Sequence, residues 1–366
     1  MRSGGWLARA ALLLMGWLVL SAAGEPGLHV ETFGAAPVWH GPQKVQADAK
    51  GNVFLLRGDT LEVYPVLKNA TLGKPVKLET AHSLNGPVID AAMGIGPGDW
   101  LLRLPLEVRW FVDGKEKALP PLPWKPWSVA YLRGTPVVGV LPQAAPVNGM
   151  EIRHPGEEVP STGPAVMELS GDRWSVLIED ARPAQQDANS AVESCARTVL
   201  GDHQGKLWTA RNYAYVLDRY SPAGHRLLRV EVDKGKVTHR DAKTATVPAE
   251  VRAGDRASFR PFLAVQRISD LTEGLDHRIY LLVQGQTGVE LDRYDPAEAS
   301  LERMELGLDL TGNATLAAGR DALYLAAHSG DHGRWRISWE EVERGRWKKV
   351  MVDGEVAAPP TPKPHP

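Results

Sequence analysis

The chain has 366 residues, of which 43% are hydrophobic and 23% are charged. This composition excludes a disordered chain and a bundle of membrane helices, because it provides both a sizeable core and a charged surface. The 42 basic and 44 acidic residues nearly balance. A protein dedicated to nucleic acid usually carries an excess of basic residues that neutralise phosphates, so we expect no nucleic-acid partner.

Residues 1–24 have the three-part pattern of a secretory signal peptide. Arg2 and Arg9 precede an apolar run at residues 10–20, and residues 21–24 are small enough for a cleavage site. The apolar run is shorter than the ~20 residues that a membrane-spanning helix needs. We therefore predict a periplasmic or secreted protein with no transmembrane segment after cleavage of the signal.

Cys195 is the single cysteine of the chain. The exported domain must therefore fold without an internal disulfide and rely on burial of its core. We expect Cys195 to be a small buried hydrophobic residue, because a reactive thiol needs an exposed setting that stabilises the thiolate.

Short β-rich runs, each preceded by a polar turn, recur after an N-terminal extension at residues 25–43. The residues that mark these runs are Phe54, Trp100, Val138, Trp174, Trp208, Tyr280 and Tyr324. Their intervals are 34–46 residues apart from one of 72, which is close to the ~40–50 residues of a four-stranded propeller blade. The long interval contains a polar stretch at about residues 233–261, which we interpret as an insertion loop.

Further strands follow the marker residues within several units. Second strands are predicted at 61–64, 108–112, 215–220, 289–294 and 335–339, and outer strands at 75–78, 227–232, 301–306 and 347–352. Residues 335–339 show the alternation of apolar and polar side chains that a half-buried strand requires. Residues 181–192 are the one stretch to which we assign a short helix.

These patterns predict an all-β protein, a β-propeller of four-stranded antiparallel blades at residues 44–353. We favour six blades. Seven is the alternative, because the Trp174 unit either forms a blade of its own or gives an outer strand to its predecessor. The extension at 25–43 is a candidate for a strand that closes the ring, and the Pro-rich residues 354–366 are expected to form a disordered tail.

A seven-residue motif marks the repeat. Leu-Asp-Arg-Tyr-Ser-Pro-Ala at 217–223 recurs as Leu-Asp-Arg-Tyr-Asp-Pro-Ala at 291–297. Together with Gly-Lys-Leu-Trp at 205–208, this motif resembles the NHL-like and six-bladed propeller proteins exported by bacteria. Because the Asp-Arg-Tyr core of the motif recurs, we interpret it as blade packing and ion pairing rather than as chemistry.

Three asparagines are candidates for a metal site. Asn85, Asn189 and Asn313 each lie shortly before a predicted innermost strand, where side chains converge on the mouth of a propeller's central channel. In the related lactonase and senescence-marker-like propellers, oxygen ligands at this mouth hold a divalent cation, which implies calcium. Asp90, Glu193 and Asp309 could add charge to such a ring. In the other interpretation the asparagines are turn formers and the protein has no cofactor.

Three groups that contain histidine have a simpler interpretation. His328, Asp331 and His332 are chemically suited to zinc, but they fall between two strands, where we expect an exposed loop. Asp202-His203 and Asp276-His277 occur at repeat turns, where aspartate accepts hydrogen bonds from backbone N–H groups. We therefore assign both pairs to the fold.

We expect a monomeric exported propeller that binds a protein, peptide or saccharide partner and performs no catalysis. Trp124, Trp127 and the insertion at about 233–261 are the expected contact elements. The alternative is a metal-dependent hydrolase or lyase, of calcium type, with its site at the mouth of the central channel. We assign no residue to catalysis.

Overall fold

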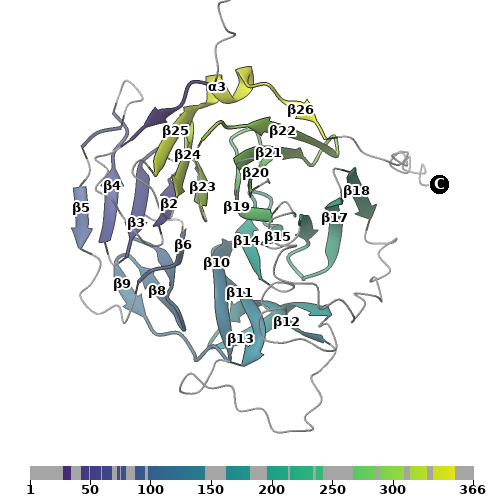
Figure 1. Cartoon of the computed structure of the whole chain (residues 1–366). Helices are drawn as coiled ribbons and strands as arrows, with labels where there is room; N and C mark the ends of the chain where they lie inside the picture. The colour runs from purple at the N-terminus through teal and green to yellow at the C-terminus, as the bar shows by residue number, and fades with distance from the viewer. Residues whose placement is uncertain are drawn as a thin grey trace, which may run out of the picture.

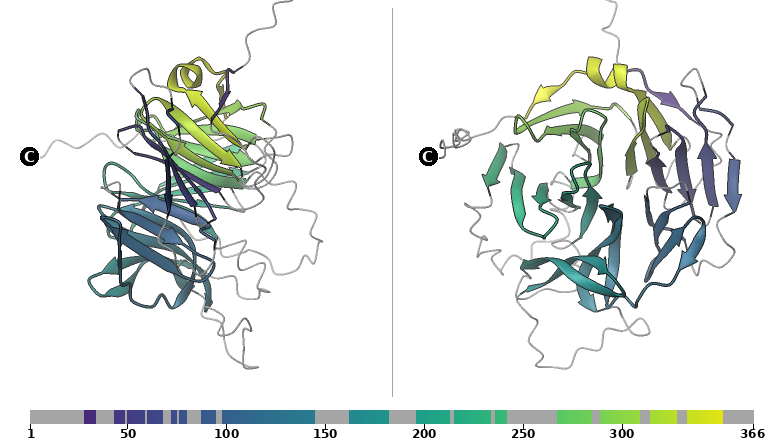
Figure 2. Two further views of the ribbon diagram at one scale, coloured as in Figure 1. Left: turned by 90° about the vertical axis from the view of Figure 1, so that its left-hand side faces the viewer. Right: turned by 180° about the vertical axis from the view of Figure 1, so that it is seen from behind.

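The computed structural model describes residues 28–33, 43–48, 50–58, 60–67, 72–74, 76–79, 87–94, 98–144, 162–181, 196–212, 215–233, 236–241, 267–284, 289–308, 314–327 and 333–350. In this part of the chain, strands form six antiparallel sheets arranged in a ring about a central axis (Figure 1). The view from behind shows the same ring (Figure 2, right). The protein is a six-bladed β-propeller, as the repeat spacing predicts.

Each blade has four antiparallel strands, and two blades carry a fifth at the outer edge. From the channel outward, blade one consists of β2 (Gln43–Ala47), β3 (Val53–Arg57), β4 (Thr60–Tyr64) and β5 (Val76–Glu79). Blade two consists of β6 (Asp90–Met93), β7 (Trp100–Arg103), β8 (Val108–Val112) and β9 (Lys115–Lys117). Blade three consists of β10 (Trp124–Leu132), β11 (Thr135–Ala144), β12 (Thr162–Ser170) and β13 (Arg173–Ala181). Blade four consists of β14 (Arg197–Gly201), β15 (Leu207–Arg211), β16 (Val216–Tyr220), β17 (Arg226–Asp233) and β18 (Lys236–Asp241). Blade five consists of β19 (Arg267–Glu273), β20 (Ile279–Gln284), β21 (Val289–Asp295), β22 (Ser300–Glu305) and β26 (Lys348–Lys349). Blade six consists of β23 (Ala314–Ala318), β24 (Ala322–Ala327), β25 (Arg334–Ser338) and β1 (Glu31–Thr32).

The Trp174 unit belongs to blade three. Trp174 lies in β13, the outermost strand of that blade, and its Nε1 donates a hydrogen bond to the Pro120 carbonyl at 2.9 Å. The unit is therefore an outer strand of its predecessor, which confirms six blades over seven. The strands β12 and β13 have nine residues each and form a long hairpin. Trp174 therefore follows a polar turn, as the marker residues of other blades do, although no new blade begins there.

Two segments differ from the expectation. Residues 236–241, expected in the insertion loop, form β18, because the outer edge of β17 offers backbone groups that a further strand can pair with. Trp339, expected in a strand, begins the helix α3 (Trp339–Arg344). Ser338 caps this helix by accepting the backbone N–H of Glu341 at 3.2 Å, a Ser-x-x-Glu signal that the strand prediction missed.

Other expectations fall outside the described residues. These are the signal peptide, Cys195, the rest of the insertion, the Pro-rich tail and, beyond the end of β13, the short helix. Within the described part of the chain, no helix has the length and apolar character needed to cross a membrane.

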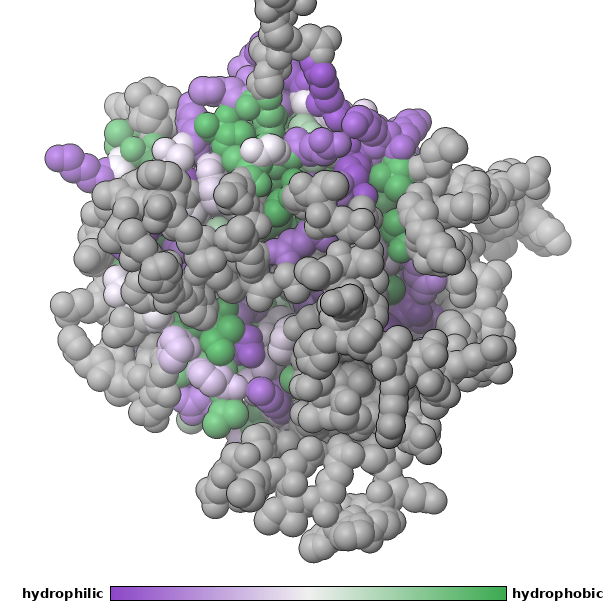
Figure 3. All heavy atoms as spheres, viewed as in Figure 1, coloured by the Kyte–Doolittle hydropathy of each residue, from purple (hydrophilic) through white to green (hydrophobic). Residues whose placement is uncertain are grey.

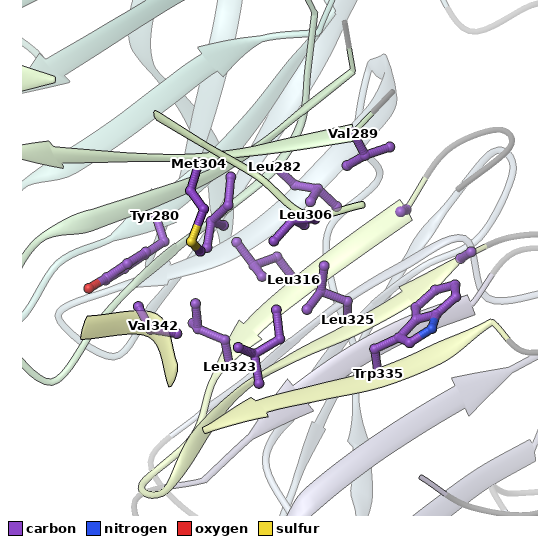
Figure 4. Close-up of a cluster of buried hydrophobic side chains, with 14 residues drawn as sticks. Tyr280, Leu282, Val289, Met304, Leu306, Leu316, Leu323, Leu325, Trp335 and Val342 are labelled. Atoms are coloured by element: carbon purple, nitrogen blue, oxygen red, sulfur yellow. The ribbon is translucent and has the colours of Figure 1, made fainter. Parts of the chain in front are cut away.

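The core lies between neighbouring blades rather than within one sheet. Between blades five and six, Leu282 and Leu291 pack with Leu316 and Leu325, and all four are fully or almost fully buried (Figure 4). Val342 of α3 belongs to the same cluster. Each blade therefore depends on both neighbours to bury its two faces, which makes closure of the ring essential.

The ring is closed by the N-terminal strand. β1 pairs with β25 as the outermost strand of blade six, and Glu31 forms an ion pair with Arg336 at 2.7 Å. Phe33 follows β1 and packs edge-on against Tyr64 of blade one and Tyr324 of blade six, with centroids 5.6 and 5.5 Å away. Phe33 thus fills the junction of the first and last blades.

We expect Phe33→Ala to lower the free energy of unfolding by roughly 3–5 kcal/mol, because it leaves a cavity at the closing junction. Urea denaturation measures this change. Leu67→Ala is the control, since Leu67 is 49% exposed and its loss should cost less than about 0.5 kcal/mol. Equal stability of the two variants would show that the ring does not depend on this junction.

The Asp-Arg-Tyr motif serves ion pairing and packing. Asp218 and Asp292 are buried, and each accepts two hydrogen bonds of 2.6–2.8 Å from an arginine on the next strand, Arg229 and Arg303 respectively. The Tyr215 hydroxyl of blade four donates to Asp292 of blade five. The motif therefore holds together strands within a blade and also connects adjacent blades.

Asp202 organises the turn that precedes the motif. Its Oδ1 accepts the backbone N–H groups of Gln204 and Lys206 at 2.9 and 2.8 Å. Its Oδ2 accepts hydrogen bonds from Trp208 at 3.0 Å and Arg219 at 2.7 Å. Burial alone would raise the pKa of Asp202, but these hydrogen bonds outweigh burial and lower the pKa below its ordinary value.

This lowered pKa makes Asp202 a source of acid sensitivity. The carboxylate stabilises the fold above its unfolded pKa of about 3.9, and the contribution is lost as the pH falls through the folded pKa. Asp202→Asn should therefore be destabilised at neutral pH, with the difference from wild type narrowing in acid. Urea unfolding between about pH 3 and pH 7 tests this. Asp172→Asn, in an exposed turn, is the control, and a difference that does not vary with pH would contradict the expectation.

Candidate functional site

A polar pocket lies at one end of the central channel. Its volume is about 230 Å³, and it lies near the residues with which the innermost strands begin. Every blade contributes to its lining, which consists of Lys44, Ile89, Asp90, Arg103, Trp127, Ser128, Thr198, Asn212, Ile268, Ser269, Asp270, Ala314 and Thr315. The pocket therefore exists only in the closed ring.

Hydrogen bonds between side chain and backbone link each blade to the next around the channel. From blade one to blade four, Gln46 Nε2 donates to the Ala91 carbonyl at 3.2 Å, the Val129 amide to Asp90 Oδ2 at 3.0 Å, and Ser128 Oγ to the Arg197 carbonyl at 2.6 Å. From blade four back to blade one, Asn212 Nδ2 donates to the Ile268 carbonyl at 3.1 Å, the Leu316 amide to Asp270 Oδ2 at 2.8 Å, and the Val45 amide to Thr315 Oγ1 at 3.2 Å. Five of these six bonds involve a side chain that lines the pocket. The walls of the pocket are thus also the links between blades.

Lys44 lies between two carboxylates. Its Nζ is 2.9 Å from Asp270 Oδ2 and 3.2 Å from Asp90 Oδ1, and all three side chains are largely buried. Burial alone would lower the pKa of Lys44, but the two carboxylates outweigh burial and raise the pKa above its ordinary value. Lys44 therefore stays charged and joins blade one to blades two and five.

Asp270 has the opposite balance. Its burial, together with the nearby charge of Asp90, outweighs the attraction of Lys44 and raises the pKa of Asp270. Lys44, Asp90 and Asp270 form a triad of one ammonium group and two carboxylates, so the two carboxylates share a single cation. Arg103, which also lines the pocket, supplies the second positive charge.

Arg103 has side-chain donors that no group in the described part of the chain accepts. Its Nε donates to the Pro126 carbonyl at 3.2 Å, and its guanidinium carbon is 5.4 Å from the centroid of the Trp127 ring. In the described structure its two Nη atoms have no hydrogen-bond partner. Burial lowers the pKa of Arg103, while the charge of Asp90 opposes this effect.

Trp127 is held in place as a wall of the pocket. Its Nε1 donates to Asn212 Oδ1 at 2.7 Å, and Asn212 Nδ2 donates to Thr198 Oγ1 at 2.9 Å. These bonds fix the indole beside Arg103. The site therefore combines a rigid aromatic surface with a guanidinium whose forked donors are unused.

The structure places some of the expected site residues and leaves others outside the described chain. Trp127 lines the pocket, whereas Trp124 is half-buried and packs against the apolar cluster of blades two and three. Asp90 also lines the pocket, bound to Lys44. The expected residues outside the described part are Asn85, Asn189, Asn313, Glu193, Asp309, His328, Asp331 and His332.

Sequence reasoning missed Lys44, Arg103, Asn212 and Asp270. Lys44 and Asp270 stand in short runs that mix polar and apolar residues, QKVQA and RISDLTE, so neither run signals a buried charge. The two residues are also 226 positions apart, so the sequence does not pair them.

The pocket does not favour the calcium interpretation. Lys44 Nζ occupies the position between Asp90 and Asp270 that a cation would take. The second oxygen of Asp90 accepts the Val129 amide at 3.0 Å. Both carboxylates are thus engaged by protein donors, and a divalent ion would have to displace a buried ammonium group to reach them.

We expect Lys44→Met to lower the free energy of unfolding by about 3–5 kcal/mol, because it leaves two buried carboxylates without their cation. The loss should shrink as the pH falls, since protonation removes the unpaired charge. Denaturation at several pH values measures both effects. Lys348→Met is the control, because Lys348 is 77% exposed in its contact with Glu305. Wild-type stability of Lys44→Met would show that the triad does not support the ring.

The comparisons with known proteins found a likeness of fold alone. No protein-family model matches the sequence, and no curated protein matches it. Among solved structures, a streptogramin B lyase is 12% identical, with 89% of this chain and 88% of that chain covered and a TM-score of 0.45. A virginiamycin B lyase from Staphylococcus aureus is 10% identical (84% and 98% covered, TM-score 0.44), and U3-55K is 11% identical (86% and 100% covered, TM-score 0.48). At these values the likeness carries no inference about activity or partner.

Proposed function

We propose that this chain is a binding module that receives a carboxylate of a protein or peptide partner in the polar pocket. The observation that carries the proposal is Arg103, which is buried in the pocket wall and whose Nη atoms meet no acceptor among the described residues. A guanidinium presents two parallel N–H donors that match the two oxygens of a carboxylate. An aspartate, a glutamate or a C-terminal carboxylate supplies such a pair.

The other charged groups of the pocket favour the same ligand. Asp90 and Asp270 share the charge of Lys44, and each also accepts a backbone amide, so their oxygens are already held by protein donors. Lys44 is held by both carboxylates. Arg103 remains as the group that gains most from an added anion.

The size of the pocket favours a macromolecular partner. A volume of about 230 Å³ is smaller than the ~300–1,000 Å³ of a typical small-molecule site. One side chain or chain terminus fits, and the rest of the partner would lie on the surrounding face. On the face seen in Figure 1, hydrophilic and hydrophobic residues of the described part are interspersed (Figure 3).

Catalysis has less support than binding. The raised pKa keeps Lys44 protonated, so it is not available as a general base. The Ser128 hydroxyl donates to the Arg197 carbonyl at 2.6 Å, so this proton is not directed to a base. We therefore prefer the binding module to a metal-dependent hydrolase or lyase.

We also propose that the protein acts outside the cytoplasm as a monomer. The signal-like residues 1–24 support export, and the motif shared with NHL-like propellers supports relation to exported bacterial proteins. A periplasmic or extracellular location would bring the pocket to peptides and proteins of that compartment.

Selection of a random heptapeptide library on the purified chain tests the proposal. Enriched peptides should share an acidic side chain or require a free C-terminal carboxylate. Arg103→Gln should weaken their binding by about 30-fold or more, since an ion pair at an interface is typically worth ~2–5 kcal/mol when one partner is removed. Titration calorimetry measures this loss.

Arg109→Gln is the matched control. Arg109 lies in the same blade but pairs with Glu107 at 3.0 Å and does not line the pocket. This variant should bind the enriched peptides as the wild type does. If Arg103→Gln binds them equally well, or if the enriched peptides carry no carboxylate in common, the proposal is wrong.

A further inference from the structure

Two histidines and a glutamate meet at the end of the channel opposite the pocket. Glu273 is the last residue of β19, whereas the pocket is lined by Ile268, Ser269 and Asp270 from the first four residues of that strand. His203 lies in the turn after β14, and His277 lies in the turn after β19. The strands belong to neighbouring blades four and five (Figure 1). The cluster is thus separate from the proposed binding site.

The three side chains direct ligand atoms toward one another. The imidazole rings stack, with centroids 3.7 Å apart and planes inclined by 26°. His203 Nδ1 contacts Glu273 Oε1, and His277 Nδ1 lies 3.6 Å from the same oxygen. One nitrogen from each histidine and one carboxylate oxygen all lie within 4.8 Å of one another.

The carboxylate is fixed from the opposite side. Glu273 Oε2 accepts the backbone N–H of His203 at 2.8 Å, and the Glu273 side chain is 14% exposed. The His203 and His277 side chains are 39% and 60% exposed. The cluster therefore has an anchored acid and two imidazoles that remain open to solvent.

His277 stands at a turn position where two other blades use glycine. Its φ is 62°, in the left-handed region that favours glycine. The same hydrogen-bonded turn follows the innermost strands of blades one and four, where Gly51 and Gly205 take this position with φ of 91° and 68°. A histidine at this position carries a conformational cost that glycine avoids, and such a cost often marks a functional site.

The sequence alone does not reveal that His203 and His277 occupy different positions of their turns. Asp202-His203 and Asp276-His277 look equivalent in sequence, but His277 aligns with Gly205, and His203 aligns with Leu275. The histidines are therefore not copies of one turn residue. They occupy different positions of adjacent turns and converge on Glu273.

We propose that His203, Glu273 and His277 bind a divalent transition metal, with zinc as the ion that fits best. Two imidazole nitrogens and a carboxylate oxygen are ordinary zinc ligands at about 2.0–2.2 Å, which places tetrahedral ligands about 3.4 Å apart. The present ligand atoms lie within 4.8 Å of one another, so side-chain rotations must bring them closer by roughly an ångström to reach that spacing. Three protein ligands and the exposed rings leave the fourth position open to water or to a group of a partner.

Zinc titration of the purified chain, after removal of metal with a chelator, tests the site. Calorimetry with zinc chloride should show that the wild type binds one equivalent of zinc at this site. His277→Gly and Glu273→Gln should each fail to bind it. Cobalt(II) should give the visible absorption of a tetrahedral site in the wild type and lose it in the same variants. Zinc should also raise the Tm of the wild type and not that of His277→Gly.

The variants separate metal binding from folding. His277→Gly installs the residue that blades one and four use at this turn, so it should fold at least as well as the wild type. His225→Ala is the control, because it removes an exposed histidine of blade four and leaves the cluster intact. If His277→Gly keeps the full zinc stoichiometry and cobalt spectrum, or if the wild type binds no zinc, the proposal is overturned.

Discussion

The ammonium group of Lys44 lies between the carboxylates of Asp90 and Asp270, and this buried contact ties blade one to blades two and five. The side chains of a propeller blade pack mainly against the adjacent blades, so the ring is held by a series of neighbour contacts. The triad adds a connection beyond the adjacent blade, because blades one and five are not neighbours. Since buried charges are costly unless they are paired, each member of the triad requires the others.

The triad also determines the chemistry of the pocket. Lys44 offsets one of the two carboxylate charges at this channel mouth, and Arg103 brings the second positive charge to the lining. Arg103 then stands as the cation with unused donors, next to an indole fixed by Asn212. The contacts that close the ring and the group that would receive a ligand are therefore parts of one structure.

The two ends of the channel differ in character. The pocket end has an arginine and a lysine held among carboxylates, which suits recognition of an anion. The opposite end brings His203 and His277 to Glu273, which suits a transition metal. β19 contributes Asp270 to one end and Glu273 to the other, so a single strand connects them.

Much of the fold followed from local sequence patterns. The spacing of turns and β-rich runs predicted the propeller and favoured six blades. The repeated Asp-Arg-Tyr motif predicted ion pairing, and Asp218 pairs with Arg229. These features are repeated at short range, so a single chain displays them. Helix α3 could also have been predicted, because Ser338 and Glu341 form the required cap spacing.

The sites could not be predicted in the same way. The pocket takes residues from all six blades, and Lys44 meets Asp270 only after the ring has closed. Trp127 was a candidate contact residue and lines the pocket, but its position beside Arg103 depends on a contact between different blades. The stacking of His203 and His277 depends on a shift between two similar turns that the sequence alignment conceals.

The most direct measurement is a crystal structure of the chain with a bound peptide selected for affinity. The account predicts a peptide carboxylate about 2.7–2.9 Å from both Nη atoms of Arg103, beside the Trp127 ring, with Lys44 still bound to Asp90 and Asp270. A peptide bound elsewhere, or one held by Lys44 after it has left the two carboxylates, would contradict it.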